Sequence, residues 1–175
     1  MATGRKNKLT GQIAEHLVCA ELGRRNLIAT PFAGNVPTFD VIAADEACHT
    51  VAIQVKATTG NTWPSHAQRW MRLTLDKQSG VQHYDGPVEL TDGDLIYVCV
   101  ALGERKKQRL DRFFILTKRE VQQACIDSYT RYMEPKGWRR PRSQASFDNR
   151  FSINQIARFE DNWDLVKSRL SQAVG

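Results

Sequence analysis

The sequence lacks long apolar runs, and its few cysteines lie far apart. No stretch approaches the roughly 20 apolar residues that a membrane-spanning helix needs, and the first eight residues are polar and basic. Secretion and membrane insertion are therefore not expected. The cysteines, Cys19, Cys48, Cys99 and Cys125, have no short pair spacing, which argues against a zinc knuckle and a dense disulfide framework. We expect a reduced, cytoplasmic protein.

Internal repeats and low-complexity tracts are also missing, and the four histidines have no repeated ligand spacing, which argues against a zinc or di-histidine site. The 175 residues fit one compact domain, because each of two independent cores would fall near the size at which burial struggles to offset chain entropy. We therefore expect a single domain over residues 1–175, with a basic irregular segment at about residues 134–150.

Positive charge is in excess: 25 Lys and Arg stand against 19 Asp and Glu, a net charge of +6. This balance favours a polyanionic partner, most simply nucleic acid. A soluble protein that is merely basic fits the total equally well, so the positions of the charges decide more than their sum.

Helix and strand patterns alternate along the chain. A helix capped by Thr10 is predicted to end near residues 23–26, because its apolar residues recur at helical spacing. Thr117 and Glu120 form a capping-box pattern that opens a helix to about Met133. Loops are predicted at residues 60–65 and 80–93. The remaining elements are strands at 27–32, 38–44, 50–58, 69–75, 94–102 and 112–116, and a last helix at about 160–170.

The residues that could bind a metal or act on a substrate lie on two neighbouring predicted strands. Gln54 and Lys56 are two residues apart, so the pleat of the strand places them on one face, and Val55 points into the core with its carbonyl free as a ligand. Asp40 lies on the preceding strand, where a turn would let the two strands pair antiparallel. A carboxylate, an amide oxygen and an ammonium would converge there. Hard divalent cations such as Mg²⁺ or Mn²⁺ prefer oxygen ligands, and Lys56 could act on an attacking water or on a phosphate.

Three short segments together resemble a known superfamily of nucleases. They are Gly11-Gln12-Ile13-Ala14-Glu15 on a helix, Thr38-Phe39-Asp40, and Gln54-Val55-Lys56. In this order they resemble the PD-(D/E)XK, or restriction-endonuclease-like, superfamily over roughly the first third of the chain. The resemblance implies an α/β fold with a restriction-endonuclease-like core, a mixed central sheet flanked by helices. It also implies three strands after the first helix, then a helix and a further strand.

The resemblance also implies nucleic-acid cleavage with Mg²⁺ or Mn²⁺ held at the motif. Phe39 replaces the motif's proline, and Gln54 replaces its acidic residue, a QxK variant similar to that of some group I intron homing endonucleases. An amide in place of a carboxylate removes a negative charge from the metal site, so Glu15 gains importance as a ligand. Family spacing selects Glu15, with Glu21 a second choice that could instead pair with Arg24 or Arg25.

Two basic segments are candidates for contact with DNA. One contains Arg105, Lys106 and Lys107. The other contains Lys136, Arg139, Arg140 and Arg142, interleaved with Trp138. Cations in loops can bind the phosphate backbone, and Trp138 could stack on a base. Solvated turns are the alternative interpretation. Trp63, Trp70 and Trp163 are expected to be packing residues.

The sequence thus predicts a metal-dependent DNA endonuclease with Asp40, Gln54, Val55 and Glu15 around the metal and Lys56 assisting the water. A homodimer or higher homo-oligomer is expected, because one such site cuts one strand and cleavage of both strands needs two. A non-catalytic DNA-binding module with a degenerate motif is the rival hypothesis. A junction resolvase, a repair nuclease and action on RNA also stay open.

Overall fold

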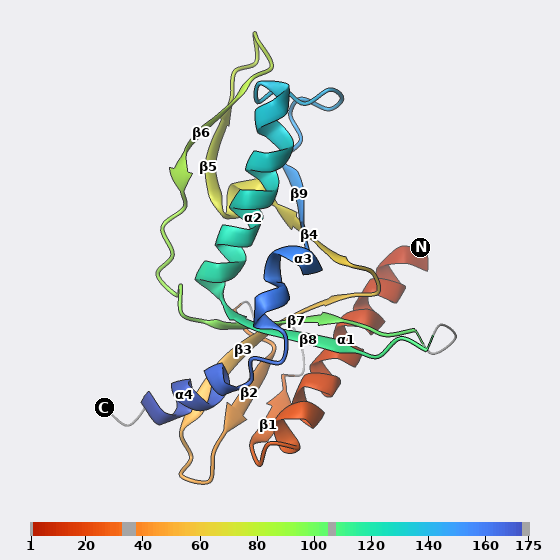
Figure 1. Cartoon of the computed structure of the whole chain (residues 1–175), viewed down its shortest axis with the longest axis vertical. Helices are drawn as coiled ribbons and strands as arrows, with labels where there is room; N and C mark the ends of the chain where they lie inside the picture. The colour runs from red at the N-terminus through yellow and green to blue at the C-terminus, as the bar shows by residue number, and fades with distance from the viewer. Residues whose placement is uncertain (1, 33–37, 105–107, 173–175) are drawn as a thin grey trace.

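A five-stranded mixed sheet forms the centre of the computed structural model, which describes residues 2–32, 38–104 and 108–172 (Figure 1). Its strands are, in spatial order, β1 (Ile28–Pro31), β2 (Val41–Ala44), β3 (Thr50–Thr58), β7 (Ile96–Ala101) and β8 (Arg112–Thr117). The pairs β1–β2, β2–β3 and β7–β8 are antiparallel, and β3–β7 is parallel. The protein therefore has the mixed α/β fold, with a mixed central sheet flanked by helices, that the sequence predicts.

The other elements surround this sheet or extend from it. The helices are α1 (Ala2–Gly23), α2 (Lys118–Met133), α3 (Ile153–Ile156) and α4 (Asp164–Gln172), with 3₁₀ turns η1 (Ala67–Arg69), η3 (Glu134–Lys136) and η4 (Ala157–Phe159). Two small antiparallel sheets pair β4 (Thr62–His66) with β9 (Asp148–Ser152) and β5 (Met71–Leu75) with β6 (Gln82–Pro87). We call α2, η1 and the two small sheets the arm, because Figure 1 shows them extending together away from the central sheet. In the described part of the chain, no helix combines the length and apolar character needed to cross a bilayer.

The central sheet buries apolar side chains on both faces. One face packs against α1 and α4 through alternate strand residues, among them Val41, Ile53 and Val55. The opposite face packs against the arm through the strand residues that point the other way, such as Tyr97 and Cys99 on β7. Two core clusters therefore lie on either side of a single sheet, as the alternation of side chains along a strand requires.

Several elements begin or end where the sequence predicts, and others do not: the strand expected at 38–44 begins only at Val41, so Asp40 lies just before it, and the last helix begins at Asp164. Thr117 caps α2, and its capping box with Glu120 is present. Trp63, Trp70 and Trp163 are buried packing residues, as expected. The first helix, however, begins at Ala2 and not after Thr10. No proline interrupts the preceding residues, so the helix continues towards the amino terminus through the position expected to cap it.

Three segments expected to be loops contain structure. The segment 60–65 contributes to β4, the segment 80–93 contains β6, and the segment 134–150 includes η3 and the first residues of β9. Pro64 fits in β4 because a strand of a two-stranded sheet has an edge on which a missing N–H is tolerated. The superfamily's helix between the third strand and the next core strand is not found among described residues 59–95, where the arm's strands make the connection.

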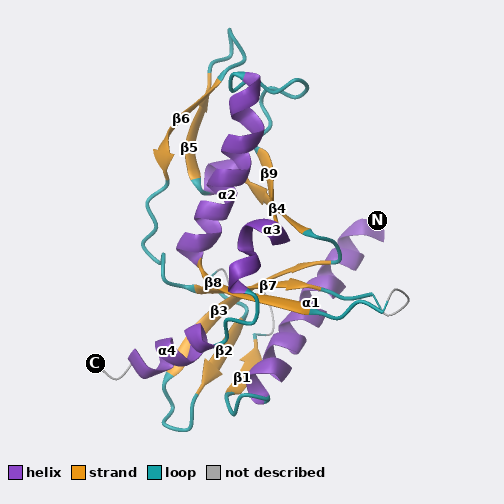
Figure 2. Cartoon of the chain, in the orientation of Figure 1, coloured by secondary structure: helices purple, strands orange, loops and turns teal. Residues whose placement is uncertain are grey.

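A buried glutamine anchors the basic segment to the rest of the arm. Gln82 donates from Nε2 to the carbonyl oxygens of Gln144 (2.8 Å) and Ser146 (3.1 Å). Its Oε1 accepts a hydrogen bond of 2.6 Å from the hydroxyl of Tyr129 on α2. Both Gln82 and Tyr129 are fully buried. The segment is therefore held at the far end of α2, where Figure 2 shows loops gathered.

Replacing Tyr129 by phenylalanine should test this anchor. The change removes the hydroxyl that Gln82 Oε1 binds and leaves a buried acceptor without a partner, which costs about 1–3 kcal/mol of unfolding free energy. Urea denaturation of Tyr129→Phe measures the loss, and Tyr132→Phe is the matched control because Tyr132 is exposed. Equal stability of the two variants would contradict the role of Gln82 as an anchor.

Candidate active site

Asp40 is fixed where β2 and β3 begin to separate. Its backbone N–H donates to the carbonyl of Ile53 at 2.9 Å and continues the ladder one residue beyond β2. Its Oδ2 accepts from the backbone N–H of Val55 at 2.7 Å and from the side-chain amide of Gln54. The carboxylate thus takes the place of a backbone acceptor at the end of β2, and this holds it against β3.

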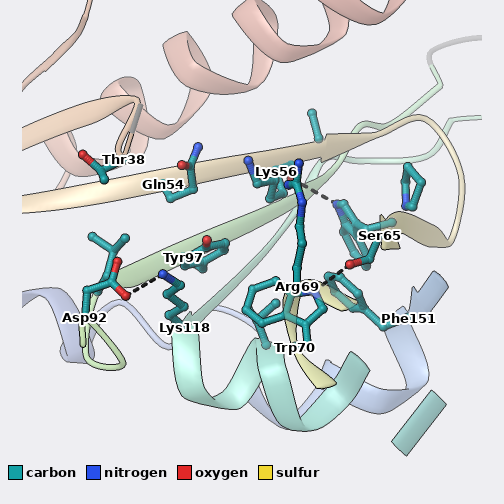
Figure 3. Close-up of a pocket in the computed structure, with 15 residues that line it drawn as sticks. Thr38, Gln54, Lys56, Ser65, Arg69, Trp70, Asp92, Tyr97, Lys118 and Phe151 are labelled. Atoms are coloured by element: carbon teal, nitrogen blue, oxygen red, sulfur yellow. Dashed lines mark hydrogen bonds and ion pairs between the residues drawn. The ribbon is translucent and has the colours of Figure 1, made fainter. Parts of the chain in front are cut away.

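Gln54 and Lys56 project from the face of β3 opposite the α1 core. Ile53 and Val55 between and beside them are buried among the residues that pack against α1, so the pleat turns Gln54 and Lys56 to the arm side. Figure 3 shows both side chains on that face. The N–H and C=O of a strand residue point to the same side, so the carbonyl of Val55 faces the strand edge at which Asp40 lies.

Glu15 approaches this group from α1. Partial burial raises its pKa, and repulsion from the nearby carboxylate of Asp40 adds to the rise, whereas His16 and Lys56 lower it. Asp40 and Glu15 are thus close enough to repel each other, with a lysine near both. The structure therefore brings Asp40, Gln54, Lys56 and Glu15 together, from the residue next to β2, from β3 and from α1.

Lys56 has a desolvated ammonium, although the residue as a whole is exposed. This desolvation lowers its pKa, and the positive charge of Arg69 lowers it further, against the opposing attraction of Asp40, Cys99 and Glu15. Its backbone carbonyl accepts a 3.0 Å hydrogen bond from Nε1 of Trp63. That bond ties β4 of the arm directly to β3, which we call the motif strand because it carries Gln54 and Lys56.

A pocket of about 300 Å³ opens between the motif strand and the arm (Figure 3). Gln54 and Lys56 line one side of it. Arg69 and Lys118 come from the arm, and Lys118 is paired with Asp92 at 2.5 Å. Sequence reasoning did not identify Arg69, Lys118 or Asp92 as site residues. No local spacing links them to Asp40, because η1 and the start of α2 reach the pocket only through tertiary packing.

The donors around Asp40 suit a single divalent cation. Two mutually repelling carboxylates, Asp40 and Glu15, would be relieved by a bound cation, and the Val55 carbonyl faces the same edge. Gln54 presents its donating NH₂ to Asp40, so it would offer its oxygen only after the amide turns over. Among the described residues, no three His, Cys, Asp or Glu side chains form a cluster that could hold a metal. The oxygens that could bind a cation here are of mixed type: two carboxylates and one backbone carbonyl.

Glu21, the second choice for a ligand on the first helix, is engaged elsewhere. Its carboxylate forms ion pairs with Arg24 and Arg25, the latter at 2.6 Å, and these interactions lower its pKa despite some desolvation. The expected pairing is confirmed, and it leaves Glu15 as the helix carboxylate near Asp40.

The second basic segment divides into anchored and exposed residues. Trp138 stacks on Tyr84 with ring centroids 5.9 Å apart, and Lys136 donates to the carbonyl of Tyr132 at 2.6 Å. Arg140 donates to the carbonyl of Asp148. In contrast, Arg139 and Arg142 are exposed, and no side-chain partner is found for them among the described residues. Arg105, Lys106 and Lys107 lie outside the described residues.

This basic segment lies far from the candidate active site. The two sites lie at opposite ends of α2. Its first residue, Lys118, lines the pocket, and its last residue, Met133, is followed by η3, where the basic segment begins. The 16 residues of α2 at about 1.5 Å per residue span about 24 Å. The arm thus separates the exposed arginines from Lys56 by a distance comparable to several base pairs of duplex DNA.

Comparisons with known proteins give a fold and no family. No protein-family model matches the sequence, and no curated protein matches it significantly. Among solved structures, the chain is similar to that of a bacterial homing endonuclease, I-Ssp6803I, with a TM-score of 0.52 and 13% sequence identity. The match covers 94% of this chain and 95% of that one. At this identity the likeness shows that the two proteins share a fold over nearly their whole lengths.

Proposed function

We propose that this protein is a metal-dependent DNA endonuclease of the PD-(D/E)XK type, in its QxK variant. The observation that carries the proposal is the meeting of Asp40, Gln54 and Lys56 on one sheet face, with Glu15 beside them. A fold shared with a protein described as a homing endonuclease supports it. The chemistry is hydrolysis of a phosphodiester: a P–O bond forms to water, the ester P–O bond breaks, and the leaving oxygen takes up a proton.

The roles of the residues follow from their placement. Asp40 and Glu15 would hold Mg²⁺ or Mn²⁺ together with the Val55 carbonyl and, after its amide turns, Gln54. When bound, such a cation neutralises the phosphate and lowers the pKa of an attacking water. Lys56 stands on the same face with a desolvated ammonium, where it can orient that water or stabilise negative charge in the transition state.

The same proposal extends to the partners of the protein. Lys136, Trp138, Arg139, Arg140 and Arg142 form the basic segment proposed to contact DNA, and the free exposure of Arg139 and Arg142 favours these two as the phosphate contacts. Arg105, Lys106 and Lys107 are proposed as a second contact on sequence grounds. We further propose a homodimer, which would supply one active site for each strand, and a cytoplasmic location, with which four unpaired cysteines agree.

A digestion panel tests the activity itself. The purified chain should cut duplex DNA in Mg²⁺ or Mn²⁺ and lose that activity in EDTA, because the two carboxylates alone supply no electrophile. Supercoiled, linear, single-stranded and branched DNA, with a matched RNA, distinguish an endonuclease on duplexes from a junction resolvase, a repair nuclease or a ribonuclease. Binding of DNA without cleavage under every condition would favour the non-catalytic rival.

Variants of the motif test the assignment of the site. Asp40→Asn and Lys56→Ala should each reduce the single-turnover cleavage rate by about 100-fold or more, as expected for loss of a group that acts on the reacting atoms. Asparagine is chosen because it keeps an acceptor for the N–H of Val55, whereas alanine would leave that N–H unpaired at a cost of about 1–3 kcal/mol.

The control for these variants is Lys167→Ala. Lys167 is exposed on α4, a helix that packs on the sheet face opposite the pocket, so its removal changes the net charge as Lys56→Ala does without touching the site. Thermal unfolding checks that all three variants are folded. If Lys56→Ala cleaves DNA as fast as Lys167→Ala, Lys56 has no part in the mechanism.

The exposed arginines of the basic segment can be tested by salt dependence. Replacing Arg139 and Arg142 by alanine should flatten the dependence of log affinity on log salt by up to about 1.8, since each lost phosphate contact on duplex DNA accounts for about 0.9. Binding is measured in Ca²⁺ to suppress cleavage, with Asp40→Asn as the variant expected to keep the original slope. An unchanged slope in the double variant would mean that the segment is only a solvated loop.

A further inference from the structure

Arg69 brings a second positive charge into the pocket. It is the last residue of η1 and is followed by the buried Trp70. Trp70 donates from Nε1 to the hydroxyl of Ser65 at 2.7 Å, and its carbonyl accepts from Nε2 of Gln122 at 2.9 Å. Ala67, two residues before Arg69, is fully buried. The backbone that carries Arg69 is therefore held on both sides by packed and hydrogen-bonded groups.

The guanidinium of Arg69 is exposed in the pocket and has no hydrogen bond or ion pair with any described residue. Figure 3 shows its side chain extending across the pocket towards Lys56. The other cation from the arm, Lys118, is instead neutralised by Asp92. Two like charges brought together without a carboxylate between them weaken the fold and do nothing for packing, so this arrangement suits an anion that binds between them.

An anion bound in the pocket would have charges of different sign on its two sides. Asp40 and Glu15 do not line the pocket themselves, but both interact with Lys56 from the side of β2 and α1, and together they balance the charge of one divalent cation. Arg69 reaches in from the arm on the other side, with Lys56 between. A phosphate held at Lys56 would therefore meet the carboxylate-bound cation on one flank and a guanidinium on the other.

We infer that Arg69 binds a non-bridging oxygen of the phosphate that is cleaved and stabilises the charge that develops there, an inference that rests on the proposed nuclease function. A guanidinium presents paired N–H donors to phosphate oxygens, and such a fork strengthens as the phosphorus becomes more negative in the transition state. Because Gln54 is neutral, the site has few carboxylates to hold metal ions. Arg69 would supply positive charge from the protein itself.

Two measurements on the full chain test this inference, both with one duplex DNA as the probe. Arg69→Ala should lower the single-turnover cleavage rate by about 100-fold, as loss of one donor to a developing anion does in other enzymes. In Ca²⁺, the same variant should flatten the dependence of log affinity on log salt by about 0.9. Arg69→Lys should keep the salt slope and recover only part of the rate, because it restores the charge without the fork.

Arg24→Ala is the matched control, since Arg24 is 73% exposed at the end of α1 and its loss changes the net charge equally. Methylguanidinium added to Arg69→Ala should restore part of the rate but should not affect Arg24→Ala. A structural role for Arg69 would instead lower the melting temperature and give no such rescue. Circular dichroism and thermal unfolding of all variants make that distinction.

The outcomes separate this inference from the proposed function. If wild type cleaves DNA and Arg69→Ala matches Arg24→Ala in rate, Arg69 does not bind the cleaved phosphate, even if its salt slope is reduced. A fall in rate with rescue supports the inference with or without a change in slope. If wild type cleaves nothing while Arg69→Ala still loses slope, the nuclease proposal fails and a phosphate contact by Arg69 stands. An inactive wild type with an unchanged slope overturns both.

Discussion

The pleat of β3 is the constraint on which the site depends. Ile53 and Val55 are buried against α1, and this fixes the face that Gln54 and Lys56 present to the arm. A shift of one residue in the pairing with β2 would bury the lysine and expose the apolar residues. The burial that stabilises the sheet therefore also keeps the polar pair in the pocket, so the fold and the site share one register.

Asp40 shows how the end of a strand can hold a functional group. Asp40 makes the last backbone hydrogen bond of this strand pair, to the carbonyl of Ile53, and its carboxylate accepts the N–H of Val55 where a backbone carbonyl would otherwise do so. An unpaired N–H at this position would be costly. The hydrogen bond from the N–H of Val55 thus orients the Asp40 carboxylate. Glu15 approaches it from α1.

The arm contributes positively charged residues that the central sheet does not present at the pocket, Arg69 among them. Its β4 is tied to the motif strand through the Trp63 hydrogen bond to Lys56, and its η1 places Arg69 over the pocket. At the other end, about 24 Å along α2, Gln82 holds the basic segment. A duplex lying along the arm would extend about seven base pairs between these points, at about 3.4 Å per pair. The proposed chemistry and the proposed grip on DNA would thus be separate parts of one footprint.

The sequence by itself determined the local features: the period of β3, the capping box at Thr117 and Glu120, and the order of Glu15, Asp40, Gln54 and Lys56. Each depends on neighbours within a few residues or on a short hairpin. Only the tertiary structure decided that β4 pairs with β9, that Trp138 packs on Tyr84, and that Arg69 faces Lys56. These contacts join segments far apart in the chain, and their free energy comes from burial that no local pattern records.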